Sequence, residues 1–233
     1  MKIAIISDIH SNLEALKRVF ASIDEREAEA VYCLGDIVGY GSYPNECVDL
    51  VREKCSIVLQ GNHDAGAFGG LPLDHFNEFG RVAMRWTKMN LTSENLAFLG
   101  KLKPSSTSDV LSLAHATPHE PSLWRYVLSW PDAERSFKAF STKLCFIGHT
   151  HVPMVVGEDR KVDNLRPRVK HLVNVGSVGQ PRDGNPRASY GLFDTERWAY
   201  ENVRVEYDVD RAAQAILKAR LPDFLAQRLY LGI

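Results

Sequence analysis

Five short polar segments with metal-binding residue types interrupt the apolar runs of this sequence. Each segment directly follows a run that is expected to form a β-strand. The segments are Asp8-Ile9-His10, Gly35-Asp36, Gly61-Asn62-His63-Asp64, His115 and Gly148-His149-Thr150-His151. In a sheet covered by helices, the carboxyl ends of the strands form one edge, and ligands bind at that edge. We therefore expect the segments to bring carboxylates, a carboxamide and imidazoles to one shared site.

This mixture of side chains suits a two-metal centre that cleaves phosphate esters. Two cations about 3.5–4 Å apart can clamp a phosphate and activate a bridging water for in-line attack. Such a centre needs one carboxylate that bridges the metals and further ligands for each ion. Imidazoles disfavour Ca²⁺ and Mg²⁺, which prefer oxygen ligands. Imidazoles combined with carboxylates favour Mn²⁺, Fe or Zn²⁺.

Each segment taken alone also has a simpler structural interpretation. Gly35-Asp36 and Gly61-Asn62 are common turn dipeptides, because Gly and Asn tolerate unusual backbone angles. An isolated His115 after an apolar strand is often a satisfied core histidine. His149 and His151 are harder to explain in this way, since two imidazoles so close together at a strand end need partners. The coincidence of all five segments at strand ends favours the metal site.

The hydrophobic pattern predicts the elements that position these segments. Apolar runs at 2–7, 30–34 and 56–60 alternate with helical patterns, which indicates a βαβαβ unit. Ser11 and Glu14 match a capping box at the start of the first of these helices. The near-continuous apolar strands imply a sheet that is covered on both faces.

The remainder of the sequence predicts a mixed α/β domain. Helical patterns over about 65–104 indicate an excursion over one edge of the sheet. Strand patterns return at 110–114, 144–147, 153–156, 171–175, 189–193 and 198–205. Several connections between them are short, so this half should be more antiparallel. A C-terminal pair of helices follows, and at 233 residues a single domain over residues 1–233 is expected.

Composition and charge exclude several function classes. Hydrophobic residues make up 45% and charged residues 24%, as in ordinary globular proteins. The 28 basic and 29 acidic residues nearly cancel, so no net charge draws the protein to long nucleic acid or an anionic membrane. No apolar run approaches the roughly 18 residues of a membrane span. The four cysteines lack any CxxC pattern, and without signal-peptide features a cytoplasmic location is expected.

The five segments together resemble the signature of the calcineurin-like metallophosphoesterase family: D-x-H, G-D, G-N-H-[DE], H and G-H-x-H. The resemblance implies an α/β fold, a four-layer αββα sandwich of two mixed β-sheets flanked by helices. It implies two divalent transition-metal ions (Mn, Fe or Zn, with Mn favoured for activity). The implied ligands are Asp8, His10, Asp36 and His151 for one metal and Asp36, Asn62, His115 and His149 for the other.

The same resemblance implies a catalytic role for His63, which matches the family's proton donor to the leaving group. Asn62 and His63 are both expected to contact the substrate. Adjacent residues point in different directions, so His63 should face the substrate without binding metal. A protonated imidazole near neutral pH can hand a proton to a departing oxygen. Asp64 could orient His63 or cap the following segment, and orientation is favoured.

Further features resemble the compact prokaryotic branch of the family, which includes phosphodiesterases and diadenosine tetraphosphate hydrolases. They are Gly39-Tyr40-Gly41 and the run over 174–182, NVGSVGQPR. The loop over 176–184 could offer backbone N–H groups and Arg182 to a phosphate. A tight structural turn explains that loop equally well.

The predicted function is therefore a metal-dependent phosphoesterase that acts on a phosphodiester or nucleotide. A phosphomonoesterase or protein phosphatase is the alternative enzyme. A non-catalytic protein-binding scaffold needs none of the site residues, yet none is missing. A nuclease for long DNA or RNA would favour a basic groove, which this near-neutral sequence does not indicate. The expected partner is a small phosphorylated substrate, recognised by the helical excursion over 65–104 and by loops near Tyr40 and Arg182. The oligomeric state is not predicted.

Overall fold

The computed structural model describes residues 1–162 and 164–233, and its first sheet contains the N-terminal strands. The strand order is β10-β9-β1-β2-β3. The bounds are β1 (Lys2–Ile6), β2 (Ala30–Cys33), β3 (Ile57–Val58), β9 (Ala188–Asp194) and β10 (Ala199–Val205). Strands β1, β2 and β3 are parallel, whereas β9 is antiparallel to both of its neighbours. The predicted βαβαβ unit is confirmed.

The second sheet has the order β4-β5-β6-β8-β7. Its strands are β4 (Ser105–Thr107), β5 (Ser112–Ala114), β6 (Leu144–Ile147), β7 (Met154–Gly157) and β8 (His171–Asn174). The three central strands are parallel, and the two edge strands are antiparallel to their neighbours. Both sheets are therefore mixed, as predicted.

The helices lie on the outer faces and at one end of the sheets. Their bounds are α1 (Leu13–Glu25), α2 (Pro44–Lys54), α3 (Asn62–Phe68), α4 (Glu78–Asn90), α5 (Ser93–Leu99), α6 (Trp130–Lys138), α7 (Val209–Lys218) and α8 (Asp223–Leu231). Helix α2 begins at Pro44. The N–H groups of the first helical turn have no intrahelical acceptor, so a proline there costs no hydrogen bond. Among the described helices, none is long and apolar enough to cross a membrane.

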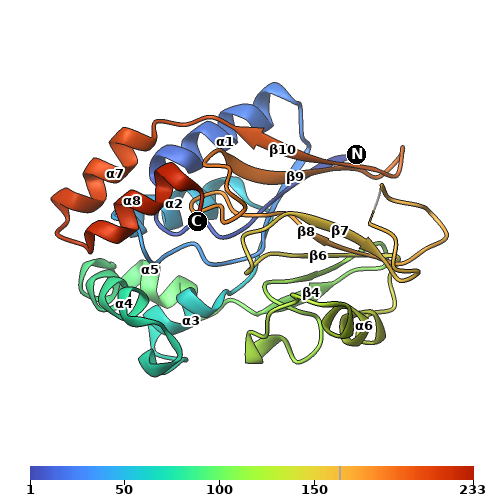
Figure 1. Cartoon of the computed structure of the whole chain (residues 1–233), viewed down its shortest axis with the longest axis horizontal. Coiled ribbons are helices and arrows are strands. Elements are labelled where there is room, and N and C mark those ends of the chain that lie inside the picture. The colour runs from blue at the N-terminus through green and yellow to red at the C-terminus, as the bar shows by residue number, and fades with distance from the viewer. Residues whose placement is uncertain (163) are drawn as a thin grey trace.

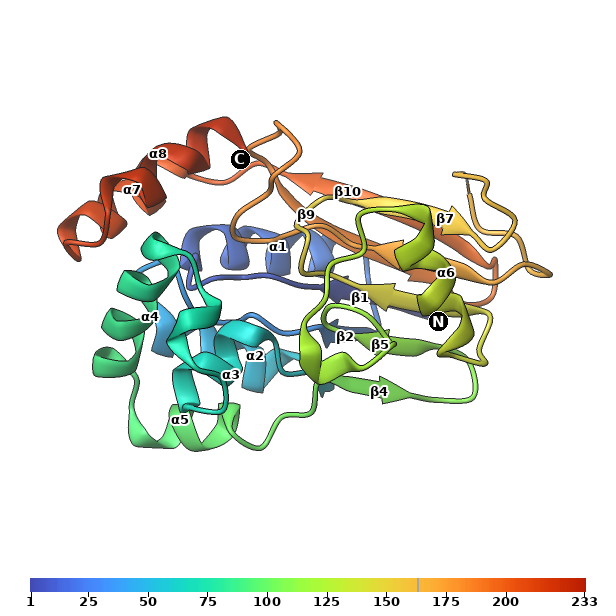
Figure 2. The same ribbon diagram turned by 60° about the horizontal axis from the view of Figure 1, so that its bottom comes forward.

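The alternation of side chains along the strands produces four layers. Ile3 and Ile5 of β1 pack against Phe146 in the second sheet, so they lie between the sheets. Ala4 and Ile6 point to the other face, where α1 covers them. Helix α6 covers the outer face of the second sheet (Figures 1 and 2). The predicted αββα sandwich is confirmed.

The segment predicted as a helical excursion folds as α3, α4 and α5. Both ribbon views place these helices at the same end of the molecule as α7 and α8 (Figures 1 and 2). Helices α7 and α8 pack against each other, and α7 also contacts α1. The C-terminal helices therefore cover the same end of the sandwich as the excursion.

The predicted capping box at Ser11 and Glu14 is wrong. Asn12 is the N-cap of α1, and its side chain accepts a hydrogen bond from the Ala15 N–H at 3.2 Å. The same side chain donates to the Gly179 carbonyl at 2.9 Å. Ser11 has a φ of 55°, and no described residue bonds its buried hydroxyl. A contact with a distant turn thus decides where this helix starts.

Two elements were not predicted from the sequence, β4 and α6. Strand β4 is three residues long and has no apolar pattern, because it lies at a sheet edge. Helix α6 has Ser129 as its N-cap, and the Ser129 hydroxyl donates to Asp132 at 2.6 Å. This capping signal was available in the sequence.

The two candidate caps make a direct test of how α1 begins. We expect Asn12→Ala to lower the free energy of unfolding by roughly 1–3 kcal/mol, because the helix loses its cap and a buried carbonyl loses its donor. Ser11→Ala removes a hydroxyl that has no described partner, so its effect should stay below about 0.5 kcal/mol. Urea unfolding of both variants measures the difference, and equal losses would contradict this account of the cap.

Candidate metal centre

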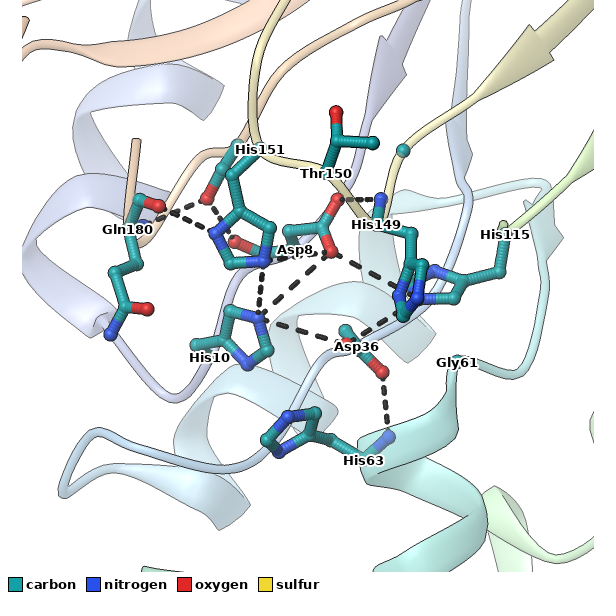
Figure 3. A network of polar contacts seen from close by, with 12 residues as sticks. Asp8, His10, Asp36, Gly61, His63, His115, His149, Thr150, His151 and Gln180 are labelled. Atoms are coloured by element: carbon teal, nitrogen blue, oxygen red, sulfur yellow. Dashed lines mark hydrogen bonds and ion pairs between the residues drawn. The ribbon is translucent and has the colours of Figure 1, made fainter. Parts of the chain in front are cut away.

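The predicted site residues lie together at the carboxyl ends of five strands, and Figure 3 labels all of them except Asn62. They follow β1 (Asp8, His10), β2 (Asp36), β3 (Asn62, His63), β5 (His115) and β6 (His149, His151). All except Asn62 are buried. The sheet-edge argument from the sequence therefore holds for every segment.

One group of donor atoms consists of Asp8, His10 and His151, whose nearest donor atoms all lie within 4.8 Å of one another. Asp8 Oδ1 lies 3.3 Å from His151 Nε2 and 3.9 Å from His10 Nε2. The other carboxylate oxygen of Asp8 accepts a hydrogen bond from the His149 N–H at 2.9 Å. One oxygen of Asp8 is thus fixed by the backbone, while the other faces the two imidazoles.

A second group consists of Asp36, His115 and His149, whose donor atoms also lie within 4.8 Å of one another. Asp36 Oδ2 lies 3.4 Å from His115 Nε2 and 3.7 Å from His10 Nε2. Because His10 belongs to the first group, Asp36 lies between the two groups. Its other oxygen accepts a hydrogen bond from the His63 N–H at 2.8 Å. This is the position that a bridging carboxylate requires.

Backbone carbonyls set the tautomers of three of these histidines. The Nδ1 atoms of His10, His115 and His151 lie 3.2, 3.1 and 2.6 Å from carbonyl oxygens of Val38, Leu34 and Gln180. A carbonyl only accepts hydrogen bonds, so each Nδ1 carries the hydrogen and each neutral ring directs an Nε2 lone pair inward. The Nε2 atoms of His10 and His151 are 3.1 Å apart. Two facing lone pairs repel each other unless a cation lies near both.

Several buried donor atoms in the centre have no hydrogen-bond partner in the described part of the chain. They are Asp8 Oδ1, Asn62 Oδ1, His115 Nε2 and His149 Nε2. Leaving such atoms unsatisfied in a protein interior costs roughly 1–3 kcal/mol each, and more for a charged group. Metal coordination would satisfy all of them, and imidazole with carboxylate suits Mn²⁺, Fe or Zn²⁺. The residues therefore fit a transition-metal site.

Burial and charge act in opposite directions on the titratable groups of the centre. Burial by itself raises the pKa of Asp36, but the imidazoles of His115 and His63 hold it well below its ordinary range. Burial lowers the pKa of His149 to about 3 and that of His10 well below its usual value. Burial also acts downward on His115, but the Asp36 carboxylate raises its pKa to about 9. Asp36, His115 and His149 could hold a cation here, and its binding would displace a proton from His115.

The chain reaches the centre through sharp turns at the strand ends. Positive φ angles occur at five of the predicted ligands: Asp8 (54°), His10 (50°), Asp36 (53°), His149 (68°) and His151 (62°). A left-handed backbone costs about 1–2 kcal/mol at a residue with a Cβ atom, although Asp and His tolerate it better than most. Such strain persists only where surrounding contacts fix the conformation, and it is concentrated at functional sites.

Two glycines of the polar segments give the carboxylates room. A Cβ atom at Gly61 would overlap the carboxylate of Asp36, and one at Gly148 would overlap Ser7 and a carboxylate oxygen of Asp8. Glycine is therefore required at both positions for close approach of the backbone to the site. The turn interpretation from the sequence does not explain Gly61, whose φ of −96° any residue can adopt.

Asp64 holds two of the loops together, and the expectation that it orients His63 is wrong. Its carboxylate accepts backbone hydrogen bonds from Asp36 (2.8 Å), Ile37 (2.9 Å), Val38 (3.2 Å) and Gly61 (2.9 Å). The alternative, a capping role, is therefore the observed one, because Gly61 is the N-cap of α3. Through these bonds Asp64 also positions the loop that carries Asp36.

His63 lies in an aromatic enclosure beside the donor groups. Its ring centroid is 4.7 Å from that of His10, 4.5 Å from Tyr40 and 4.8 Å from Phe76. No described residue accepts or donates a hydrogen bond at its buried Nδ1. Burial lowers its pKa to about 4, with the charge of Arg182 acting in the same direction. This differs from the sequence-based expectation of an imidazolium near neutral pH.

The sequence interpretation missed two aromatic residues that border the centre. Tyr126 stacks on the His149 ring with centroids 4.1 Å apart and an interplanar angle of 23°. Trp124 meets the His115 ring edge-on at 5.8 Å. Both come from the loop between β5 and α6. The only signal in the sequence was the presence of large aromatic residues in a segment without helical or strand periodicity.

Comparisons with known proteins agree with this geometry. The sequence matches the model of the calcineurin-like phosphoesterase superfamily domain over residues 1–197. An uncharacterised protein of Methanocaldococcus jannaschii is 43% identical over 240 aligned positions, which cover 99% of this chain and 98% of that protein.

Solved structures show the same similarity. A metallophosphoesterase from Sphaerobacter thermophilus is 39% identical with a TM-score of 0.89, covering 100% of this chain and 99% of that one. A hypothetical protein from Pyrococcus horikoshii OT3 shares the fold at 20% identity with a TM-score of 0.85, covering 100% and 98% of the two chains.

The chain therefore belongs to the calcineurin-like phosphoesterase superfamily, which confirms the resemblance inferred from the five segments. It is a hydrolase that acts on phosphate esters. The family uses divalent metals, and the three donor groups Asp8–His10–His151, His10–Asp36–His63 and Asp36–His115–His149 could bind them.

The position of Asp36 between the donor groups leads to a prediction about metal content. We expect purified protein to bind two transition-metal ions per chain, or to regain activity when Mn²⁺ is added after chelation. Asp36→Asn should weaken both sites together, because the carboxamide has lost the negative charge that faces both groups. Asp74→Asn, at an exposed position, is the matched control. Elemental analysis that finds no metal, with activity indifferent to chelators, would contradict the two-metal interpretation.

Proposed function

We propose that this protein hydrolyses a phosphodiester or nucleotide, at an ester or anhydride bond, with a dinuclear metal centre. The observation that supports this most directly is Asp36, which lies between two groups of buried donor atoms with unfilled bonding capacity. The proposed ligands are Asp8, His10, Asp36 and His151 for one ion and Asp36, Asn62, His115 and His149 for the other. When bound, two such ions would stabilise the charge of the phosphoryl oxygens and lower the pKa of a water for in-line attack.

The protein itself fixes the orientation of the donor side chains and buries them away from water. The carbonyls of Val38, Leu34 and Gln180 accept hydrogen bonds from the Nδ1 atoms of three imidazoles and fix the orientation of these rings. Hydrogen-bond partners of this kind typically contribute 10–100-fold to metal affinity or activity. The donor side chains are almost fully enclosed, so electrostatic interactions with a bound phosphoryl group are less screened than in water. These features are expected of a catalytic site. A scaffold protein would not need them.

We assign His63 the role of general acid toward the leaving group. Its backbone N–H is bound to Asp36, while its side chain lies against His10 and Tyr40 at the border of the centre. Because burial lowers its pKa to about 4, the free site holds a neutral imidazole at pH 7. A negatively charged substrate beside the ring favours the protonated form, so proton uptake should accompany substrate binding.

The proposal also includes assignments for the substrate contacts, the metal and the location. Asn62 and His63 are the proposed substrate contacts, and the partner is a small phosphorylated molecule. Mn²⁺ is the metal that we expect to support activity. A cytoplasmic location agrees with the absence of disulfides among the described cysteines, which are free thiols.

The general-acid assignment makes a specific kinetic prediction. General acid catalysis typically contributes 10²–10⁴-fold, but only when the leaving group needs the proton. His63→Ala should therefore lose roughly 10²–10⁴-fold in kcat on nucleoside esters and much less on p-nitrophenyl esters, whose phenolate is a stable anion. Steady-state assays on both substrate types, with metal content measured in parallel, decide between the outcomes.

Two controls separate proton donation from metal loss. His149→Ala, which removes a proposed ligand, should reduce metal content and depress both substrates alike. His75→Ala changes an exposed histidine and should leave both unchanged. If His63→Ala loses metal, His63 is a ligand and the general-acid assignment is wrong. Equal losses on both substrates with the metal retained would also contradict it.

The substrate class is tested by comparing simple esters. With Mn²⁺ present, we expect kcat/KM for bis-p-nitrophenyl phosphate to equal or exceed that for p-nitrophenyl phosphate, because the proposed substrate is a diester or anhydride. Both assays release the same chromophore under the same conditions. A strict preference for the monoester would favour the phosphomonoesterase alternative.

A further inference from the structure

One loop places an aromatic side chain against each imidazole of the second donor group. This aromatic loop, residues 116–129, connects β5 to α6. Its Tyr126 ring stacks on the His149 ring with centroids 4.1 Å apart, and its Trp124 ring meets the His115 ring edge-on at 5.8 Å. The loop therefore borders the metal centre on the side of His115 and His149.

Both ends of the aromatic loop are tied to α6. At its start, the buried hydroxyls of Thr117 and Ser136 lie 3.0 Å apart. At its end, the carboxylate of Asp132 accepts hydrogen bonds from the backbone N–H groups of Leu128 at 3.2 Å and Ser129 at 3.0 Å. These contacts hold the loop in one position, so its aromatic side chains are placed before any substrate arrives.

The backbone of the aromatic loop is strained close to these side chains. Glu120 and Trp124 have φ angles of 51° and 52°. Left-handed conformations are uncommon for residues with a Cβ atom, and a bulky residue such as tryptophan is a clear outlier there. Strain of this kind persists only where surrounding contacts fix it, and it is concentrated at functional sites. The strained loop and its position beside the donor groups therefore indicate a role in the reaction.

Tyr126 combines a fixed position with an accessible polar end. The next residue, Val127, is buried among the apolar side chains of α6, whereas 49% of Tyr126 is exposed. Within residues 1–162 and 164–233, the Tyr126 hydroxyl has no hydrogen-bond partner. A phenol is protonated at neutral pH, so its O–H can donate a hydrogen bond to a bound molecule.

The charged groups of the metal centre act on this phenol. Burial raises the pKa of Tyr126, Arg182 lowers it, and the carboxylates of Asp36 and Asp8 raise it further. The phenol therefore borders the space that the donor groups surround. His63 borders the same centre beside His10, whereas Tyr126 lies beside His149.

We propose that the Tyr126 hydroxyl donates a hydrogen bond to a non-bridging oxygen of the reacting phosphoryl group. This inference rests on the proposed function, because it names a substrate contact of the same site. Non-bridging phosphoryl oxygens carry negative charge in monoesters and diesters alike, and hydrogen bonds to charged acceptors are stronger than those between neutral groups. Tyr126 is then a catalytic residue, because it touches the group that reacts.

Tyr126 and His63 should respond differently to the leaving group. A non-bridging oxygen stays on phosphorus throughout the reaction and needs no proton from the protein. The Tyr126 contact should therefore have the same effect whether the leaving group is a good one or a poor one. Proton donation by His63 matters only where the leaving group needs the proton.

The kinetic test uses Tyr126→Phe, which removes the hydroxyl and keeps the ring on His149. With Mn²⁺ present, we expect kcat/KM to fall roughly 10- to 100-fold, because a hydrogen bond to a charged oxygen is lost. The loss should be equal on nucleoside esters and on p-nitrophenyl esters, with the metal content unchanged. The control is Tyr230→Phe, whose hydroxyl donates to Asp210 at 2.8 Å on the surface, and it should change neither activity nor metal content.

A binding measurement makes the test independent of turnover. Calorimetric titration of the Mn²⁺-loaded protein with inorganic phosphate should show weaker binding in Tyr126→Phe than in the wild-type protein and in Tyr230→Phe. If the wild-type protein hydrolyses no phosphate ester, the proposed function fails, while the titration still decides the role of Tyr126. Equal phosphate affinity in Tyr126→Phe and the wild-type protein would overturn the contact. Loss of metal in that variant, or a loss of activity that depends on the leaving group, would also overturn it.

Discussion

The structure depends on keeping the carboxylates of Asp8 and Asp36 buried together at the ends of two adjacent parallel strands. Both side chains are almost completely enclosed. Removing an ionised carboxylate from water costs several kcal/mol even after relaxation, unless opposite charge and hydrogen bonds compensate. Here the compensation comes from backbone N–H groups on one oxygen of each carboxylate and from imidazoles on the other. Burial lowers the pKa of His10 and His151, so these rings are neutral and supply no positive charge, whereas the pKa of His115 is raised to about 9 by the Asp36 carboxylate. Cations bound among these side chains would supply the remaining positive charge.

The loops that carry these groups are shaped by the same requirement. Asp64 contributes no atom to the donor groups, yet its carboxylate binds four backbone N–H groups that belong to the loop after β2 and to the start of α3. These bonds hold Asp36 in a left-handed conformation that an isolated turn would rarely adopt. Gly61 allows the two loops to meet, because a side chain there would occupy the space of the Asp36 carboxylate. The left-handed conformation of Asp36 is therefore maintained by Asp64 and permitted by Gly61, which contribute no donor atom themselves.

Much of this could be predicted from the sequence, and the failures have a common cause. The strand-end position of each polar segment and the βαβαβ unit both depend on local patterns, and both are confirmed. The start of α1 was misplaced because Asn12 is fixed by a contact with Gly179, which lies 167 residues away. Capping by Asp64 was only the alternative for the same reason, since three of its four partners are backbone N–H groups of the loop after β2. The low pKa of His63 depends on how completely Tyr40 and Phe76 enclose it, and periodicity does not show enclosure.

The donor side chains and Arg228 differ in how tightly the fold constrains their positions. The donor side chains are placed by strand ends whose positions are set by sheet hydrogen bonds, and all lie within the part of the chain that matches the family model, residues 1–197. Arg228 lies beyond that part, on a helix that reaches the site only through packing against α7 and Tyr40. A shift of a packed helix changes the reach of a long side chain without disturbing a single donor atom. The donor atoms are therefore held in place by the two sheets, whereas the contact of Arg228 with Tyr40 depends on the packing of helix α8.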